Sequence, residues 1–233
     1  MRCLSVILFL CAALTLQAAD RIFESGPLKV HLIELFTSQG CSSCPPAEAW
    51  MSKLKAEPQL WKDFVPLAFH VDYWDRLGWR DPFAAKEWTA RQYQYSASWK
   101  NDGVYTPGFV VDGRESQDRS IPTSSSDKPG VLKIRLVNEN ASAEFNPANG
   151  ATNDIDLHVA MLGFDLNTKV TAGENNGRNL HQDFVVLSLV NEKMSAGKAE
   201  IHLTTDSRAG AVVAWITAPN QLEPVQAVGG WLR

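Results

Sequence analysis

The feature that most constrains the fold is a pair of cysteines, Cys41 and Cys44, placed between an apolar segment and an amphipathic one. Residues 28–36 alternate between polar and apolar and then become almost entirely apolar, which predicts a strand with a buried end. After the pair, apolar residues recur at helical spacing and predict a helix over residues 46–56, ending before Pro58. The two thiols are therefore expected at the junction of a strand and a helix.

The N-terminus predicts export from the cytoplasm. An apolar run over residues 4–16, followed by small residues, is typical of a secretory signal peptide over residues 1–19. The run is shorter than the roughly 20 residues that span a bilayer. Cys3 and Cys11 would leave with this peptide; the alternative that Cys11 is a lipoprotein acceptor is weaker, because a large residue precedes it. The mature protein is expected to be periplasmic or secreted, where disulfides persist.

Charge and composition exclude several classes of partner. The formal net charge is −4, charges of both signs are scattered along the chain, and no basic run suggests nucleic acid. No second apolar segment suggests a membrane span after signal cleavage. Nothing in the sequence implies a cofactor or specifies an oligomer. The mature length is enough for one large domain or two small ones.

The first half of the mature chain predicts an α/β unit. A second buried strand is expected over residues 65–71. Asp81 and Pro82 are expected as the N-cap and first residue of the next helix. A third short strand over residues 109–111 ends at the turn signal of residues 112–113. Strands separated by helices imply parallel pairing between the first two strands.

The pattern changes after this unit. Residues 114–120 contain no apolar side chain, and residues 121–130 are rich in serine and proline, as in a linker or long loop. From there on the apolar residues follow a period of two between Asn/Gly turns, which predicts an antiparallel sheet or sandwich. We expect a first domain over residues 20–120 and a β-rich C-terminal domain or extension over residues 131–233. Candidate strands are 131–137, 141–145, 155–163, 184–190, 199–203, 211–217 and 224–228.

The spacing of Cys41 and Cys44 favours thiol–disulfide chemistry. At a helix start, Cys41 would lie near unpaired backbone N–H groups and the positive end of the helix dipole. Both stabilise a thiolate, and CxxC motifs of this kind lower thiol pKa values. Cys44, one turn further, would be placed to attack a mixed disulfide formed at Cys41.

Three other interpretations of the cysteine pair stay open. A structural disulfide would close a loop of about four residues and contribute roughly 2 kcal/mol, against about 4.7 kcal/mol for a 100-residue loop. A zinc site would need further ligands, and the register of His31 and His70 relative to the pair is unknown. A soft ion such as Cu(I) needs fewer ligands. The third interpretation is that the pair is a remnant in a binding module. Because the sequence does not place a further ligand beside the cysteines, we assign no metal.

Aromatic residues after the second strand form a candidate substrate groove. Asp72, Trp74 and Trp79 leave that strand at its carboxyl end, where parallel sheets bind ligands. Trp74 and Trp79 would line the groove, and Asp72 would make a polar contact. The alternative is a packed aromatic loop in which Asp72 caps a helix or turn.

Further along the chain, residues 173–178 contain Asn-Gly, which predicts a hairpin turn. The functional alternative is that Glu174 and Arg178 form a charged pair presented to a partner.

The chain contains six specific blocks of sequence, at residues 34–47, 69–75, 77–79, 81–83, 104–107 and 173–175. These blocks resemble the domain-of-unknown-function 1223 family of secreted bacterial proteins. The resemblance covers nearly the whole mature chain, dense in the first half and thin in the second. It implies a thioredoxin-like α/β fold followed by the β-rich half, and no established activity.

The resemblance also implies roles for residues of a thioredoxin-like site. Cys41 and Cys44 correspond to the nucleophile and the resolving cysteine, and Pro107 to a cis-proline that faces them. The backbone of Thr106 would then pair with an extended substrate. Glu34 corresponds to a buried acid that takes the proton of the resolving cysteine; the alternative is a strand carboxylate paired locally. Ser-Ser between the cysteines and Pro-Pro after them depart from the thioredoxin pattern.

The expected function is that of a periplasmic or secreted thiol–disulfide oxidoreductase acting on protein thiols. The rival expectation is a thioredoxin-like binding module or a copper-handling protein without turnover.

Overall fold

The strand–helix–strand unit forms around the cysteine pair as predicted. The computed structural model describes residues 20–150, 154–204 and 206–232; the predicted signal peptide, with Cys3 and Cys11, lies outside the described residues. The unit consists of β2 (His31–Thr37), α1 (Pro45–Lys53) with a 3-10 turn after it (Leu54–Ala56), and β3 (Phe64–His70). β2 and β3 pair in parallel. Two prolines occupy the first turn of α1, where a missing N–H breaks no helical hydrogen bond.

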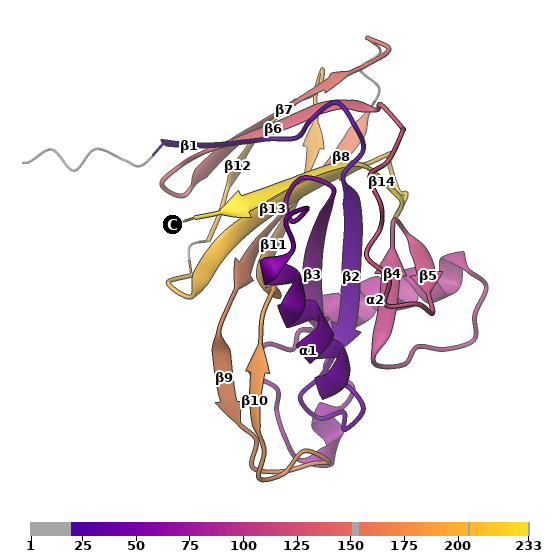
Figure 1. The fold of residues 1–233 in the computed structure, drawn as a ribbon, viewed down its shortest axis with the longest axis vertical. Coiled ribbons are helices and arrows are strands. Elements are labelled where there is room, and N and C mark those ends of the chain that lie inside the picture. Colours follow the sequence, from indigo (N-terminus) through magenta and orange to yellow (C-terminus); the bar gives the residue numbers. More distant parts are fainter. Residues whose placement is uncertain (1–19, 151–153, 205, 233) are drawn as a thin grey trace, which may run out of the picture.

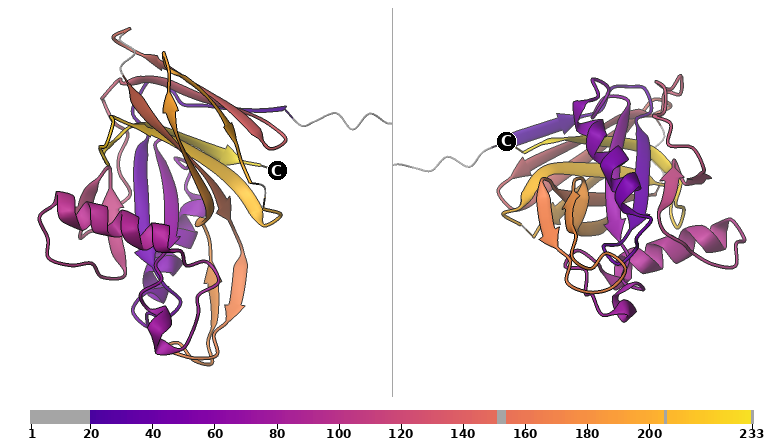
Figure 2. Two further views of the ribbon diagram at one scale, coloured as in Figure 1. Left: turned by 180° about the vertical axis from the view of Figure 1, so that it is seen from behind. Right: turned by 60° about the horizontal axis from the view of Figure 1, so that its bottom comes forward.

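The second helix begins later than the sequence predicts. After a 3-10 turn (Asp75–Leu77), α2 spans Lys86–Ser98, and its N-cap is Ala85. Asp81 is a buried hub instead: its Oδ1 accepts the N–H of Phe83 at 3.0 Å, and its Oδ2 lies 2.7 Å from His70 Nδ1. α1 and α2 cover opposite faces of the sheet, as the front and back views show (Figure 1, Figure 2).

The third predicted strand and its turn are confirmed. β4 (Gly108–Val111) pairs antiparallel with β2, and β5 (Arg114–Ser116) pairs antiparallel with β4. The turn between β4 and β5 has positive φ at both residues, 49° at Asp112 and 80° at Gly113. β5 lies in a segment without apolar residues, which is why periodicity did not reveal it.

The C-terminal half continues the same sheet. Its eight strands have the order β14-β13-β8-β11-β3-β2-β4-β5, so β11 joins β3 and connects the two halves of the chain. β11 runs parallel to β3 and antiparallel to β8. All seven predicted C-terminal strands are present. They are β6 (Gly130–Val137), β7 (Asn140–Pro147), β8 (Ile155–Gly163), β11 (Val185–Met194), β12 (Lys198–His202), β13 (Ala209–Thr217) and β14 (Pro224–Trp231).

A second sheet covers the C-terminal part of the first. It has the order β1-β6-β7-β12, with β1 at Asp20–Glu24, and lies across the upper end of the molecule in Figure 1. Buried side chains of β6 and β7 pack against β8 and β13 and form one hydrophobic core. A separate core lies around β2, β3 and the two helices. The hairpin β9 (Leu166–Lys169) and β10 (Asn179–Gln182) extends below the sheet.

The expected thioredoxin-like fold is wrong. The described residues form fourteen strands in several sheets but two α-helices, so the chain is mostly β. Among the residues that the structure describes, no helix follows β5 to cover the first unit. The period-two pattern forms strands instead, and β11 adds to the sheet beside β3. The strand-rich second half therefore decides the architecture. No helix within the described ranges is long and apolar enough to cross a membrane.

Candidate functional site

The two cysteines form a disulfide at the start of α1. The Cα atoms of Cys41 and Cys44 lie 5.5 Å apart. Both residues are buried, at 1% and 0% exposure, whereas Ser42 and Ser43 between them are exposed. Both sulfurs are therefore shielded from solvent in this structure.

A loop from the other end of the unit lies against the disulfide. The Thr106–Pro107 peptide bond is cis, and the Thr106 carbonyl oxygen lies 3.7 Å from Cys41 Sγ. Trp74 Nε1–H donates to Thr106 Oγ1 at 2.8 Å. Trp74 also packs closely on Gly40, where an added Cβ would lie 2.8 Å from Trp74 Cβ. Thr106 and Trp74 thus meet at the cysteine loop.

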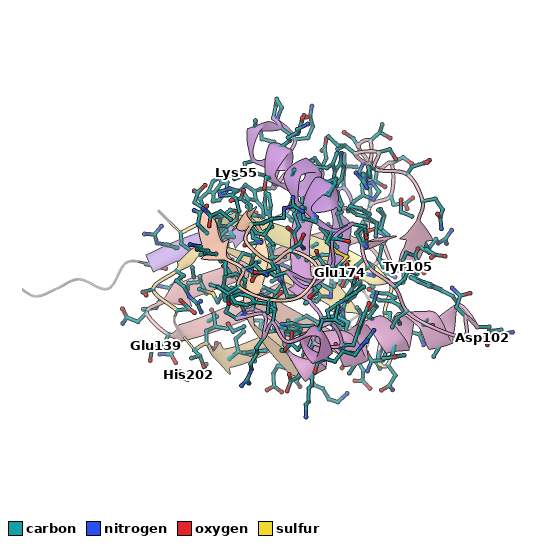
Figure 3. The ribbon with its side chains drawn as sticks, turned by 90° about the horizontal axis from the view of Figure 1, so that it is seen from below. Lys55, Asp102, Tyr105, Glu139, Glu174 and His202 are labelled. Atoms are coloured by element: carbon teal, nitrogen blue, oxygen red, sulfur yellow. A yellow bond between two sulfur atoms is a disulfide. The ribbon has the colours of Figure 1, made fainter. Side chains whose placement is uncertain are left out.

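The loop 173–178 holds the cysteine loop from the opposite side. It connects β9 and β10, which confirms the predicted hairpin. The Ser42 N–H donates to Glu174 Oε2 at 2.9 Å, and this bond lowers the pKa of Glu174. Asn175 Nδ2–H donates to the carbonyls of Gln39 and Cys41, both at 2.9 Å. Seen from below, Glu174 lies beside the disulfide (Figure 3).

Glu174 and Arg178 do not form the charged pair considered as an alternative to the turn. Arg178 donates instead to Asn175 Oδ1 at 2.8 Å and so orients the amide. Asn175 is fully buried, although Glu174 and Arg178 on either side of it are exposed. The loop therefore contacts the cysteine loop through one buried amide and one exposed carboxylate.

A buried polar cluster lies at the carboxyl ends of β2 and β3, next to the disulfide. Thr37 Oγ1–H donates to Glu48 Oε1 at 2.7 Å, and burial raises the pKa of Glu48. The Asp81 carboxylate accepts the Gln39 N–H at 2.8 Å as well as pairing with His70. Burial opposes both charges of that pair, but their attraction wins, raising the pKa of His70 and lowering that of Asp81.

Glu34 lies on the other face of the sheet. Its carboxylate pairs with Arg91 of α2, with Arg91 Nε 2.6 Å from Glu34 Oε1, and it also accepts the hydroxyl of Tyr95. Burial acts to lower the pKa of Arg91, but the Glu34 carboxylate overcomes this and raises it. Glu34 is thus locally paired with α2, whereas the acid on the face of α1 is Glu48.

The remaining groove candidates occupy different places. Trp79 Nε1–H donates to Gln39 Oε1 at 3.0 Å, and Trp79 Cβ lies near Gly173, so Trp79 packs between the cysteine loop and the loop 173–178. Asp72 bonds to Thr89 of α2: its N–H donates to Thr89 Oγ1 at 3.0 Å, and its carboxylate accepts the Thr89 hydroxyl at 2.6 Å. The structure therefore joins Trp74 and Trp79 to the cysteine loop and gives Asp72 a helix contact.

The two histidines considered as possible metal ligands each pair with a carboxylate, His31 with Asp112 and His70 with Asp81. Elsewhere in the described part of the chain, three potential ligands converge. The Lys55 ammonium lies 3.0 Å from the Asp165 carboxylate and 2.8 Å from the Asp183 carboxylate, so both already have a cationic partner. These three residues are Asp165, His181 and Asp183.

Sequence reasoning missed several residues of the site. Glu48 follows Cys44 by one helical turn, so its position on α1 was a usable signal. The contacts of Gln39 with Asp81 and Asn175 join segments far apart in the chain. Helical or strand periodicity carries no information about such pairs.

Comparison with solved structures supports the fold. Protein AGR_C_4864 from Agrobacterium tumefaciens is similar with a TM-score of 0.64 and 24% identity, over 88% of this chain and 94% of that one. HBP35 of Porphyromonas gingivalis is similar with a TM-score of 0.56 and 14% identity, over 88% and 76% respectively. Among curated proteins, none matches the sequence. A family model described as a protein of unknown function (DUF1223) matches residues 32–217.

Proposed function

Because the chain belongs to the DUF1223 family, whose description assigns no activity, we propose a function from the site: thiol–disulfide exchange with cysteines of other proteins. One observation carries this proposal. The Cys41–Cys44 disulfide stands at the carboxyl end of a parallel strand pair, with the Thr106 carbonyl 3.7 Å from Cys41 Sγ. A short disulfide loop beside a second segment with an available backbone carbonyl suits a site that receives a cysteine from an extended peptide.

The exchange proceeds through a mixed disulfide. A substrate thiolate attacks Cys41 Sγ, the Cys41–Cys44 bond breaks, and Cys44 leaves as a thiolate that takes up a proton. A second substrate thiolate then attacks the substrate sulfur of the mixed disulfide, and Cys41 leaves as a thiolate and is protonated. The substrate loses two electrons and gains a disulfide, while the two cysteines gain the electrons and end as thiols. The reverse sequence reduces a substrate disulfide.

In this proposal, Glu48 assists the proton step at Cys44. It lies one turn later on α1, and residues at this spacing share a helix face. Burial raises its pKa, which favours the protonated form that can give a proton to a leaving thiolate. We assign to Glu48 the role that the sequence resemblance had suggested for Glu34.

The burial of both sulfurs favours a second candidate, a structural clip for the start of α1. Such a clip would contribute roughly 2 kcal/mol to stability, given its short loop. It would need no access for a partner. The two candidates differ in whether a substrate thiol ever reaches Cys41.

A trapping experiment separates these candidates. Purified Cys44→Ser protein, in which Cys41 has no resolving partner, is incubated with an unfolded protein substrate carrying a disulfide. Exchange predicts a mixed disulfide through Cys41, visible on non-reducing gels and absent from the Cys41→Ser control. Equal background exchange by wild type and Cys41→Ser, together with an empty trap, would leave only the structural clip.

We also propose that the protein works outside the cytoplasm. The apolar N-terminal run predicts cleavage of a signal peptide ending near residue 19. Expression of the full chain in a bacterium, followed by cell fractionation and N-terminal sequencing, tests this. Recovery of the uncleaved chain from the cytoplasm would contradict it.

A further inference from the structure

The loop 173–178 belongs to the β-rich half of the chain, yet it contacts the cysteine loop through two consecutive side chains. Glu174 accepts the N–H of Ser42, which lies between the two cysteines, at 2.9 Å. Asn175 donates to the carbonyls of Gln39 and Cys41. Three backbone groups around the disulfide are thus held by one distant hairpin.

We propose that Glu174 and Asn175 form a clamp that holds the Cys41–Cys44 loop in its oxidised geometry and makes the disulfide harder to reduce. The inference deepens the proposed exchange activity and rests on it for its biological use. Glu174 and Asn175 are positioning residues in this proposal, because they act through the cysteine loop.

The first effect of the clamp is geometric. Asn175 is buried, and its amide is oriented by Arg178, whose guanidinium donates to the amide oxygen at 2.8 Å. Its two donated hydrogen bonds span the turn that leads into the disulfide. After the disulfide breaks, Cys41 can move away from Cys44 only if these two hydrogen bonds break or shift as well. The clamp therefore favours the disulfide form.

The second effect is electrostatic. A thiolate at Cys41 would be stabilised by nearby N–H donors, but Pro45 and Pro46 have no N–H to offer. The Ser42 N–H is already engaged by the carboxylate of Glu174. The negative charge of Glu174 also repels a thiolate at Cys41. Both contributions disfavour the reduced, ionised form of the site.

The charge effect has a signature in its pH dependence. It acts only on the ionised form of Cys41, and an ordinary cysteine ionises near pH 8.5. Removing the Glu174 charge is therefore expected to change the disulfide equilibrium little at pH 6. At pH 9 the change is expected to reach about fivefold toward the dithiol form, which corresponds to about 20 mV.

The test measures this equilibrium with glutathione as the probe. Two glutathione thiols reduce the disulfide: the Cys41–Cys44 bond breaks, glutathione disulfide forms, and two electrons and two protons pass to the protein. The mature protein is equilibrated in glutathione buffers at pH 6 and pH 9, and the thiols are alkylated and quantified by mass spectrometry. Glu174→Gln keeps an oxygen that accepts the Ser42 N–H, whereas Glu174→Ala removes the acceptor as well. Glu200→Gln on β12, an exposed carboxylate in the other sheet, is the matched control.

The proposal expects Glu174→Gln to shift the equilibrium at pH 9 and not at pH 6, and Glu174→Ala to shift it at both. In the reduced protein, the rate of Cys41 alkylation increases with pH as the thiol ionises. In both variants this increase should begin at a lower pH than in wild type, an effect that a merely structural residue would not cause. Equilibria of both variants within twofold of wild type and of Glu200→Gln would overturn the clamp. A shifted equilibrium with an empty Cys44→Ser trap would overturn the exchange function and leave the clamp standing.

Discussion

At the residue scale, the buried acids of this protein are sorted by strand parity. Successive residues of β2 point to opposite faces, so Glu34 and Thr37 lie on different sides of the sheet. Thr37 bonds to Glu48 of α1, whereas Glu34 pairs with Arg91 of α2. The cysteine-bearing helix covers one face only. Glu48 of α1 therefore lies on the face of Thr37, and Glu34 lies on the face of α2.

The buried pair of Glu34 and Arg91 yields a stability prediction. Glu34 is fully buried, so removing its cation leaves an uncompensated charge. We expect Arg91→Leu to lower the free energy of unfolding by about 3–5 kcal/mol. The double variant with Glu34→Leu should recover most of the loss, because neither charge of this pair then remains. Urea unfolding measures both.

The matched control is an exposed pair, Arg135 with Asp20, joined at 2.6 Å. Surface pairs contribute about 0–1 kcal/mol, so Arg135→Leu should change little. If Arg91→Leu cost no more than Arg135→Leu, the buried Glu34–Arg91 pair would contribute no more to stability than a surface pair.

His158 provides a pH prediction. It stacks on Trp215 and lies 2.7 Å from Asn191 Oδ1, and burial lowers its pKa to about 4. Between its ordinary value of 6.5 and about 4, the unfolded chain binds a proton that the folded protein does not. The stability contributed by the neutral ring is therefore present above pH 6.5 and is lost as the pH falls toward 4.

The expected loss reaches at most about 3 kcal/mol at pH 4, from about 1.4 kcal/mol per pKa unit. His158→Gln should flatten the fall in melting temperature between pH 6.5 and 4. His202→Gln, the same change at an exposed position, is the control. Parallel pH curves for wild type and His158→Gln would show that the ring is protonated in the fold.

At the scale of elements, the loop from β2 to α1 is shaped by what packs on it. The Cys41 N–H donates to the Ser38 carbonyl at 3.1 Å, and the Gly40 N–H to Ser38 Oγ at 3.1 Å. Trp74 lies directly over Gly40. The sequence marks this segment as a strand–helix junction, but its curvature is fitted to a side chain from the loop after β3.

Gly40→Ala tests this fit. The added Cβ would lie 2.8 Å from Trp74 Cβ, so Trp74 or the loop must shift. We expect a loss of about 1–3 kcal/mol in unfolding free energy and faster reduction of the disulfide by dithiothreitol. Gly103→Ala is the control, since nothing lies within 4 Å of its added Cβ. Equal stability of the two variants would mean that Trp74 yields without resistance.

At the scale of the whole molecule, the two halves of the chain depend on each other. The Ala68 N–H in β3 donates to the carbonyl of Phe184 at 2.8 Å, at the start of β11. Phe184, Val213 and Trp215 belong to the same core as β2, β3 and α2. Without the second half, β3 would be an open edge above an uncovered apolar face.

We therefore expect residues 20–120 alone not to fold cooperatively. The fragment should lack a sigmoidal urea transition by circular dichroism and should bind a hydrophobic dye or aggregate. The matched comparison is the chain from residue 20 to its end, which should unfold in a single transition. A cooperative transition of the fragment would show that the first unit is an independent domain.

The local pattern of apolar residues predicted the positions of many of the strands and of one of the two helices. The apolar runs and helical spacing located β2, α1, β3 and β4 within a few residues, and period two located the seven strands after residue 130. β1, β5, β9 and β10 escaped, because short or polar strands carry little periodicity. The start of α2 was misplaced because Asp81, an N-cap by sequence, bonds to Phe83 and His70 instead.

By itself, the sequence identified the residues at the centre of the candidate site: two cysteines at a strand–helix junction, a Thr-Pro segment and an aromatic loop, all within the residues 32–217 that match the family model. Tertiary structure alone decided that β11 extends the sheet, that Glu34 faces away from α1, and that Glu174 and Asn175 hold the disulfide loop. The physical reason is the distance along the chain between the residues that interact. Periodicity and spacing report which side of an element is buried, whereas pairing between distant strands and loops depends on how the whole chain packs.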